Sequence, residues 1–310
     1  EKLNHMYPKI IKGGTNNGHD PKVLEKIWED WRAFASYAFN KSHATCYSWV
    51  AYQTAYLKAN YPAQYMAAVM SRSLADIKSI TKLMDECKIL GIRTLGPDVN
   101  ESRHKFSVNS TGSIRFGMGA IKGVGESAVT AIIEEREKNG LFTSIYDFVE
   151  RINLTACNKK NIENLALAGA FDSFEQVRRE QFFATDGQGN FLDTLVRYGL
   201  RYQQDKAGAA ASLFGESDTI DIAKPLPPSD YIHWNDLERL NKERDLIGIY
   251  ISGHPLDEFS IIVKNVCTMT AIELEDIDHH SGEEVTLGGI VTDVREGQTR
   301  NGKPYGIVKL

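Results

Sequence analysis

Hydrophobic residues in the first hundred positions recur at steps of three and four, the period of an amphipathic helix. Asp20 followed by Pro21 has the form of an N-cap and a first helical residue, and an apolar face begins directly behind them. A loop at residues 40–42 leads to a second helix, Pro62 opens a third, and Gly91 stands where a fourth would end. The pattern predicts an α domain of four successive helices.

The period changes after about residue 92. Residues 106–108 and 114–116 alternate apolar and polar side chains around an Asn-Ser-Thr-Gly sequence, which predicts a short β-hairpin. Helical periodicity resumes from Gly125 to about Gln204. Residues 205–230 are rich in alanine, then acidic, then rich in proline, and we interpret them as an exposed connector.

The C-terminal part changes from helix to strand. A helix near residues 233–245 is followed by an extended apolar segment at 246–251. One strand is expected over 285–294, and Arg-Asn-Gly-Lys at 300–303 predicts a two-residue hairpin turn before a return strand at 305–308. Two strands do not form an independent sheet, so we expect a fragment that begins and ends inside a domain. The predicted fold class is mainly α within an α+β multidomain chain.

Composition is that of an ordinary soluble globular protein, with 42% hydrophobic and 25% charged residues among 310. Cys46, Cys87, Cys157 and Cys267 are scattered without Cys-x-x-Cys spacing, which argues against a zinc ribbon and fits a reducing compartment. No apolar run reaches the roughly 18 residues needed to span a bilayer, and the chain opens without a secretion signal. We expect a cytoplasmic protein with no membrane partner.

The charge is unevenly distributed along the chain. Residues 1–100 hold 13 Lys and Arg against 9 Asp and Glu, whereas the whole chain has a net charge of -5. A nucleic-acid partner would therefore be met by local basic surface in the first third. Solvated surface charge without a partner is an equal alternative.

The sharpest motif is Ile-Lys-Gly-Val-Gly-Glu-Ser-Ala at residues 121–128, the pattern of a helix-hairpin-helix turn. Gly123 and Gly125 permit a tight turn and close approach of a partner. The amides that open the following helix, including that of Ser127, can bind a phosphate oxygen, and Lys122 adds charge beside them. This pattern favours DNA-backbone binding, and the alternative is a purely structural turn. A second, glycine-poorer copy at residues 158–171 could be scaffolding alone.

A second candidate is Phe-Asn-Lys-Ser-His-Ala at residues 39–44. If Ser42 is an N-cap, Lys41 and His43 stand at the positive end of a helix, where an anion could bind. From composition alone, a cap with a surface lysine and a hydrogen-bonded histidine is the favoured interpretation.

A third candidate is the Ser212-Leu213-Phe214 sequence inside the predicted connector. Two adjacent large apolar residues in an acidic loop favour insertion into a partner, and the alternative is that they fold back onto the core.

Two other groups are weak candidates for a metal site. Asp276 and Asp278 lie in an acidic stretch that we interpret as a turn, and His279 with His280 has no evident third ligand. We therefore expect no metal site and no catalytic residue in this chain.

Six motifs together resemble one family, the alpha subunits of bacterial DNA polymerase III, which are the C-family replicative DNA polymerases. The motifs stand at residues 39–44, 52–58, 61–68, 96–100, 168–172 and 251–256. The resemblance is collinear over essentially the whole chain.

The resemblance implies a map of the N-terminal two thirds. Residues 1–100 would be the C-terminal part of the polymerase fingers, with Lys41, Ser42 and His43 facing nucleotide or template. Residues 101–205 would be the helix-hairpin-helix domain that grips duplex primer-template DNA through Lys122, Gly123, Gly125 and Ser127.

The resemblance also assigns the remainder. Residues 206–230 would be the exposed connector, in which Ser212, Leu213 and Phe214 dock on the sliding clamp, although Ala210 stands where the family usually has glutamine. Residues 231–283 would be a helix and linker. Residues 284–310 would begin a truncated OB-fold, which when complete handles single-stranded template.

What the resemblance implies for activity concerns the whole polymerase, a DNA-directed nucleotidyltransferase. Its catalytic aspartates belong to the palm, upstream of residue 1, and the Mg²⁺ and dNTP belong to the full-length enzyme. We expect the fragment to bind no cofactor and to polymerise nothing alone. The alternative is a non-catalytic helix-hairpin-helix or clamp-docking scaffold of DNA repair, and the fingers motifs favour the polymerase.

Overall fold

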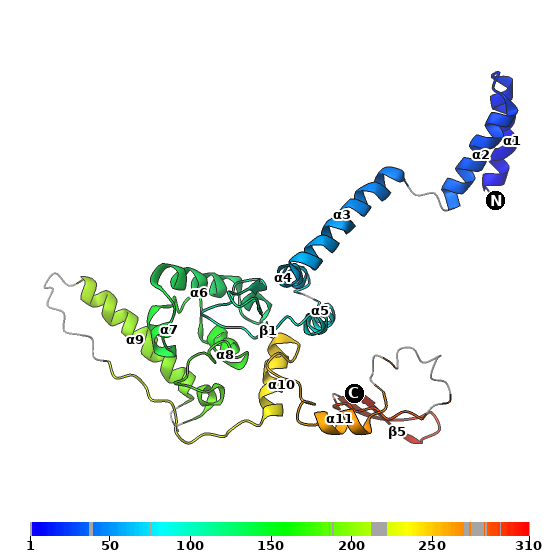
Figure 1. Cartoon of the computed structure of the whole chain (residues 1–310). Coiled ribbons are helices and arrows are strands. Elements are labelled where there is room, and N and C mark those ends of the chain that lie inside the picture. Colours follow the sequence, from blue (N-terminus) through cyan, green and yellow to red (C-terminus); the bar gives the residue numbers. More distant parts are fainter. Residues whose placement is uncertain are drawn as a thin grey trace. The chain divides into compact units, whose positions relative to one another are not determined.

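The computed structural model describes residues 2–36, 40–74, 76–185, 187, 189–211, 222–269, 273, 282, 284–291 and 293–309. The chain divides into two compact units, Glu1–Pro62 and Ala63–Leu310 (Figure 1). None of the described helices is both long and apolar enough to cross a membrane.

The first unit opens with a pair of helices. The first, α1 (Lys2–Asn16), lies against α2 (Pro21–Ser36), and the Tyr7 and Trp28 rings meet with centroids 5.5 Å apart. Trp28 is buried in this contact, as the apolar period of α2 predicts. The sequence pattern did not predict α1.

The third helix of this unit is α3 (Lys41–Asn60). It confirms the helix predicted to follow the loop at residues 40–42. In the described structure, no residue of α3 is buried. Its exposed side chains include several aromatic ones: Tyr47, Trp49, Tyr52 and Tyr56.

The second unit begins with α4 (Pro62–Arg72) and α5 (Ile77–Ile89), both predicted. Their buried residues belong to the same continuous core as the helices that follow them. This core includes Met66, Met70, Ile80, Cys87, Ile132, Phe148, Phe171 and Leu195. The compact unit therefore starts near residue 63, whereas the sequence placed a boundary near residue 100.

A small sheet follows. The strands β2 (Ser107–Val108) and β3 (Ile114–Arg115) form the predicted hairpin. The strand β1 (Thr94–Leu95), which the pattern did not predict, pairs in parallel with β3.

Helices then build the body of the unit, as predicted. They are η1 (Met118–Ala120), α6 (Glu126–Asn139), α7 (Ile145–Arg151), α8 (Lys159–Leu167), η2 (Arg179–Phe183) and α9 (Phe191–Ala211). Phe148 and Phe171 pack edge to face with centroids 5.0 Å apart in the middle of this group.

The predicted connector at residues 206–230 is wrong at its start and irregular, as predicted, at its end. Residues 206–211 continue helix α9. Residues 222–230 run along the body of the unit, where the Tyr146 hydroxyl donates to the Pro225 carbonyl at 2.7 Å and the Gln181 side chain donates to the Pro228 carbonyl at 2.9 Å. Proline has no backbone N–H to donate, so this segment joins no helix or sheet, and side chains of the body bond to its carbonyls instead.

Helix α10 (Asp236–Ile247) confirms the predicted helix and extends it by two residues into the segment expected to be extended. It ends at Gly248, whose φ of 89° gives the left-handed conformation that closes a helix. A short helix, α11 (Ser260–Val266), follows.

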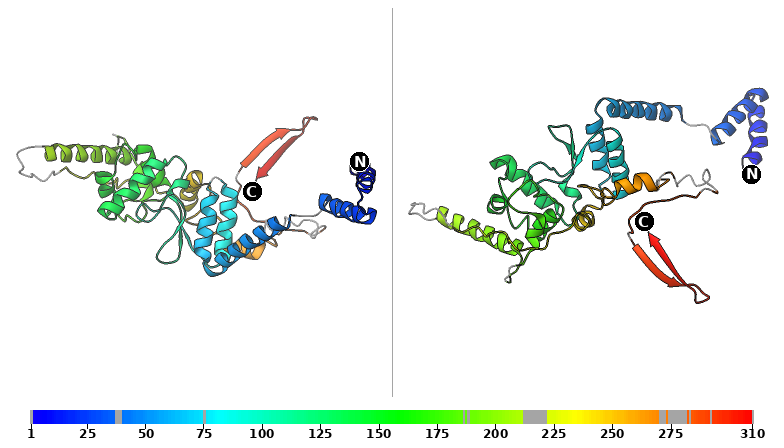
Figure 2. Two further views of the ribbon diagram at one scale, coloured as in Figure 1. Left: turned by 90° about the horizontal axis from the view of Figure 1, so that it is seen from above. Right: turned by 60° about the horizontal axis from the view of Figure 1, so that its bottom comes forward.

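The C-terminal strands are β4 (Asp293–Gln298) and β5 (Pro304–Lys309), an antiparallel hairpin (Figure 2). The return strand was predicted, but residues 285–291 are not a strand and β4 begins only at Asp293. The turn is not a two-residue loop, because Thr299 N donates to the Lys303 carbonyl at 2.8 Å and only Gly302 has a positive φ, of 73°. A two-residue turn of the expected type would need a positive φ at Asn301 as well.

Candidate nucleic-acid interface

The helix-hairpin-helix turn lies between η1 and α6, and we call residues 121–125 the hairpin turn. Ile121 and Val124 are buried, which fixes the turn on the core, while Lys122, Gly123 and Gly125 face solvent. Gly123 has a φ of 76°, a conformation that favours glycine. The hairpin turn thus alternates residues anchored in the core with residues that face solvent.

Two other helices hold the hairpin turn through its backbone. From α8, the Asn161 side-chain amide donates to the Gly123 carbonyl at 3.0 Å and the Asn164 amide donates to the Lys122 carbonyl at 3.1 Å. From α10, the Leu246 carbonyl accepts the Lys122 amide at 2.9 Å. These bonds satisfy the groups that point inward and fix the orientation of the rest of the turn.

The start of α6 supplies donors that point outward. Gly125 is the N-cap, and Ala128 is the first residue whose amide donates to its carbonyl, at 3.0 Å. Within the described chain, the amides of Gly125, Glu126 and Ser127 have no acceptor, and all three residues are exposed. Free amides at the positive end of a helix dipole form an anion site.

Two charged side chains border these amides. The Lys122 ammonium has no ion-pair partner among the residues that the structure describes. Glu126 is exposed in the first turn of α6, where its carboxylate stabilises the free helix but repels an approaching phosphate.

Helix α6 is anchored to the core at its other half. The buried Arg136 guanidinium donates to the carbonyls of Val99 and Ser102, each at 2.6 Å. Burial lowers the pKa of Arg136, because desolvation disfavours the charged form. This anchor fixes the direction in which the helix presents its N-terminus.

The second hairpin copy has the expected helix and turn, but its turn is closed. Gly169 has a φ of 82°, and a Cβ atom there would overlap the Arg179 guanidinium. Because this side chain covers the turn, the second copy lacks the open approach that the first one has. Its role in the described structure is to pack against the first copy.

Sequence reasoning missed an ionic cluster around Arg179. Its guanidinium donates to Asp172 and Glu243, with Nη1 and the Glu243 carboxylate 3.0 Å apart. Glu243 accepts from the backbone amides of Ile251 and Ser252 at 2.8 and 2.9 Å. The cluster therefore joins two of the motifs that carried the family resemblance, residues 168–172 and 251–256.

The residues assigned to the fingers lie at the start of α3. Asn40, not Ser42, is the N-cap, because its side chain accepts from Ser42 N at 2.9 Å and from His43 N at 3.4 Å. Ser42 is thus inside the first helical turn, and its predicted role as a cap is wrong. The His43 and Tyr47 rings lie 4.2 Å apart, and Lys41 is exposed beside Trp49 and Tyr52.

Ser212, Leu213 and Phe214 lie outside the residues that the structure describes, as do Asp276, Asp278, His279 and His280. Among the described residues, no three histidine, cysteine, aspartate or glutamate side chains gather as metal ligands would.

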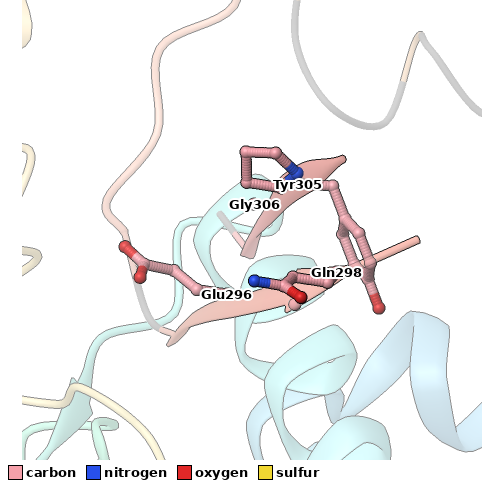
Figure 3. Close-up of a pocket in the computed structure, with 6 residues that line it drawn as sticks. Glu296, Gln298, Tyr305 and Gly306 are labelled. Atoms are coloured by element: carbon pink, nitrogen blue, oxygen red, sulfur yellow. The ribbon is translucent and has the colours of Figure 1, made fainter. Parts of the chain in front are cut away.

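The C-terminal hairpin carries one aromatic side chain placed by a glycine. Tyr305 pairs with Gly297, and a Cβ atom at 297 would lie 2.6 Å from Tyr305 Cζ. The glycine lets the ring cross the neighbouring strand, and Figure 3 shows the Glu296 side chain directed away from the ring. Tyr305 is half-exposed.

Comparison with known proteins finds a family model for the region of the turn and relatives along nearly the whole chain. A family model described as a helix-hairpin-helix motif matches residues 91–181. The DNA polymerase III subunit alpha of Vibrio cholerae is 36% identical over 300 residues, 96% of this chain. That of Mycobacterium tuberculosis is 36% identical over 312 residues and that of Chlamydia trachomatis is 37% identical over 274 residues, which cover 100% and 87% of the chain. The chain belongs to the DNA polymerase III alpha subunit family.

The chain spans about a quarter of the length of these polymerase subunits: 25%, 26% and 21% of the Vibrio, Mycobacterium and Chlamydia proteins. The helix-hairpin-helix match includes the hairpin turn, both asparagines of α8 and Arg179. The mainly α fold with small sheets agrees with this membership.

Proposed function

We propose that this chain is the part of a bacterial replicative DNA polymerase that holds duplex primer-template DNA through the hairpin turn. The observation that carries the proposal is the set of free, exposed amides at Gly125, Glu126 and Ser127, with Lys122 beside them. Such a site binds backbone phosphate and reads no base, which suits an enzyme that must hold every sequence it copies.

Gly123 and Gly125 contribute to this function in different ways. Gly123 supplies the left-handed conformation of the turn, whereas Gly125 has ordinary backbone angles and only the Ser127 hydroxyl near its missing Cβ, at 3.8 Å. Gly125 therefore has no packing reason to be glycine. Its bare backbone lets a phosphate approach the amides of α6.

The fingers assignment is the second part of the proposal. Lys41, Ser42 and His43 would face nucleotide or template, with Lys41 providing the positive charge and the start of α3 providing the helix dipole. The alignments with the Vibrio and Mycobacterium polymerases, which extend over 96% and 100% of the chain, favour this assignment over a repair scaffold built on helix-hairpin-helix units.

Two further contacts belong to the proposal. The Ser212-Leu213-Phe214 segment would dock on the sliding clamp, with Leu213 and Phe214 filling an apolar pocket and Ala210 unable to supply the polar contact of a glutamine. The β4–β5 hairpin would be the start of an OB-fold that contacts single-stranded template once complete.

Catalysis would depend on residues outside this chain. The family places its catalytic aspartates in the palm, where Mg²⁺ would bind the incoming dNTP during phosphoryl transfer. We infer that this chain alone, which would act in the cytoplasm, binds no cofactor and incorporates no nucleotide. A primer-extension assay with the purified chain tests this inference, and incorporation above a mock preparation would refute it.

Fluorescence anisotropy with a labelled primer-template duplex and the matching single strand tests the main proposal. The wild-type chain should bind the duplex more tightly, and Gly125→Val should abolish that preference because its side chain blocks the amides. Gly208→Val is the matched control, since Gly208 in α9 is exposed and has no atom near its missing Cβ. Equal binding by the Gly125 and Gly208 variants would overturn the proposal.

A binding assay on immobilised sliding clamp tests the clamp contact separately. Replacing Leu213 and Phe214 with alanine should remove clamp binding and leave duplex affinity unchanged, since the segment is distinct in sequence from the hairpin turn. Clamp binding that survives this double replacement would show that the chain uses another surface or none.

A further inference from the structure

The hairpin turn does not fix its own conformation. Its two inward carbonyls, those of Lys122 and Gly123, are held by the side chains of Asn164 and Asn161. These two asparagines belong to α8, about forty residues further along the chain. We call them the asparagine pair.

The environment of the asparagine pair indicates a specific task. Asn161 and Asn164 are 7% and 4% exposed, and burial of a polar amide is unfavourable unless the amide is hydrogen-bonded. An apolar residue at position 164 could be buried in the core without needing a hydrogen-bond partner. In the described structure, the carbonyl that accepts from the Asn164 side-chain amide belongs to Lys122, in the hairpin turn.

Steric contact couples Asn164 to Gly123 as well. A Cβ atom on Gly123 would overlap Asn164 Nδ2. The side chain of Asn164 thus occupies the space that any other residue at 123 would need. The hydrogen bond and the close contact together determine where the Lys122–Gly123 peptide lies.

We propose that Asn161 and Asn164 are positioning residues for the DNA-phosphate site: they hold the two turn carbonyls inward so that the amides of α6 and the Lys122 side chain face the phosphate. In this arrangement the second helix-hairpin-helix copy contacts no phosphate itself, because Arg179 covers its glycine turn. Its helix α8 instead fixes the geometry of the first copy. This role rests on the proposed duplex binding.

Salt titration of duplex binding tests the role. Asn164→Ala should weaken duplex binding about tenfold, because the hydrogen bond that holds the Lys122 carbonyl is lost. It should also reduce the slope of log K against log salt by about 0.9, the equivalent of one phosphate contact. Leu165→Ala is the matched control, since Leu165 is a fully buried neighbour on α8 that does not bond to the turn. It should lower thermal stability and leave the salt slope unchanged.

A second variant keeps the test decisive if Asn164→Ala unfolds. Asn164→Asp preserves the side-chain shape but replaces the donor with a carboxylate facing the Lys122 carbonyl. Affinity relative to wild type should be low at neutral pH and should recover as the pH falls, because a protonated carboxyl donates again. If the ratio of the duplex affinities of this variant and wild type does not change with pH, the positioning role of Asn164 is contradicted.

A double-mutant cycle isolates the contact between the two residues. Gly123→Ala should reduce affinity less in the Asn164→Ala background than in wild type, because the overlap with Nδ2 is gone. Additive effects together with an unchanged salt slope would overturn the positioning role while leaving the proposed function intact. Absence of duplex binding by the wild-type chain would overturn both.

Discussion

Arg179 and Glu243 form an ion pair with Nη1 and Oε2 3.0 Å apart, and their side chains are only 9% and 2% exposed. Glu243 also accepts from the amides of Ile251 and Ser252 and from the Ser252 hydroxyl, the last at 2.7 Å. One carboxylate therefore joins α10, η2 and the segment that leads toward the C-terminal hairpin.

We expect Glu243→Ala to lower the free energy of unfolding by about 3–5 kcal/mol, because it removes the buried one of the two carboxylates that pair with the buried Arg179 guanidinium. Asp172→Ala is the control, since that carboxylate contacts the same guanidinium but is 50% exposed and water can replace it. Urea unfolding followed by circular dichroism measures both variants. If the two variants lose the same unfolding free energy, the burial of Glu243 does not determine how much its ion pair stabilises the fold.

The two glycines of the hairpin turn should separate stability from binding. Gly123→Ala places a side chain at a φ of 76° against Asn164, so it should lower the melting temperature as well as duplex affinity. Gly125→Ala has room for its methyl group and should leave the melting temperature unchanged while weakening duplex binding. Thermal melts and anisotropy on the same preparations test this pair, and a melting temperature lowered equally by both variants would refute it.

Glu126 should oppose DNA binding in the free chain. Its carboxylate stands in the first turn of α6, beside amides that we assign to phosphate. Glu126→Gln removes the like charge and should raise duplex affinity several-fold at low salt, with a smaller effect at high salt because salt screens the repulsion. A Glu134→Gln variant, further along the same helix, is the control. Weaker binding by Glu126→Gln would contradict the phosphate assignment.

The four cysteines should differ in reactivity. Burial raises the pKa of Cys87 to about 11 and that of Cys157 to about 12, and both side chains are fully buried. Cys46 is exposed on α3 and Cys267 is half-buried. Alkylation at pH 8 followed by mass spectrometry should label Cys46 first and Cys87 and Cys157 only after denaturation. Rapid labelling of Cys157 in the native chain would contradict its burial.

The sequence predicted the helices well where an apolar face is buried. The faces of α4, α5 and α8 follow the expected period, and the core forms from them. It failed for α1, which packs against α2, and for residues 285–291 of the predicted strand at 285–294. Helix α1 carries Pro8 and two glycines, which weaken its helical signal in the sequence. Strand propensity over 285–291 depends on cross-strand neighbours, which the sequence pattern does not give.

The candidate site shows a similar division. The residues of the hairpin turn could be predicted, because glycine and helix-start chemistry are local in the sequence. The groups that hold the turn could not, since Asn164 and Leu246 reach it through tertiary contacts that no spacing encodes. The N-cap of α3 was predicted at Ser42 instead of Asn40, because serine and asparagine cap helices about equally well.

The most direct test of duplex binding at the hairpin turn is the salt dependence of binding by two lysine variants. Lys122 and Lys138 lie before the start and near the end of α6, and both are exposed. If Lys122 contacts a phosphate, Lys122→Ala should reduce the slope of log K against log salt by about 0.9, while Lys138→Ala should leave it unchanged. Equal slopes for the two variants would contradict a phosphate contact at the hairpin turn.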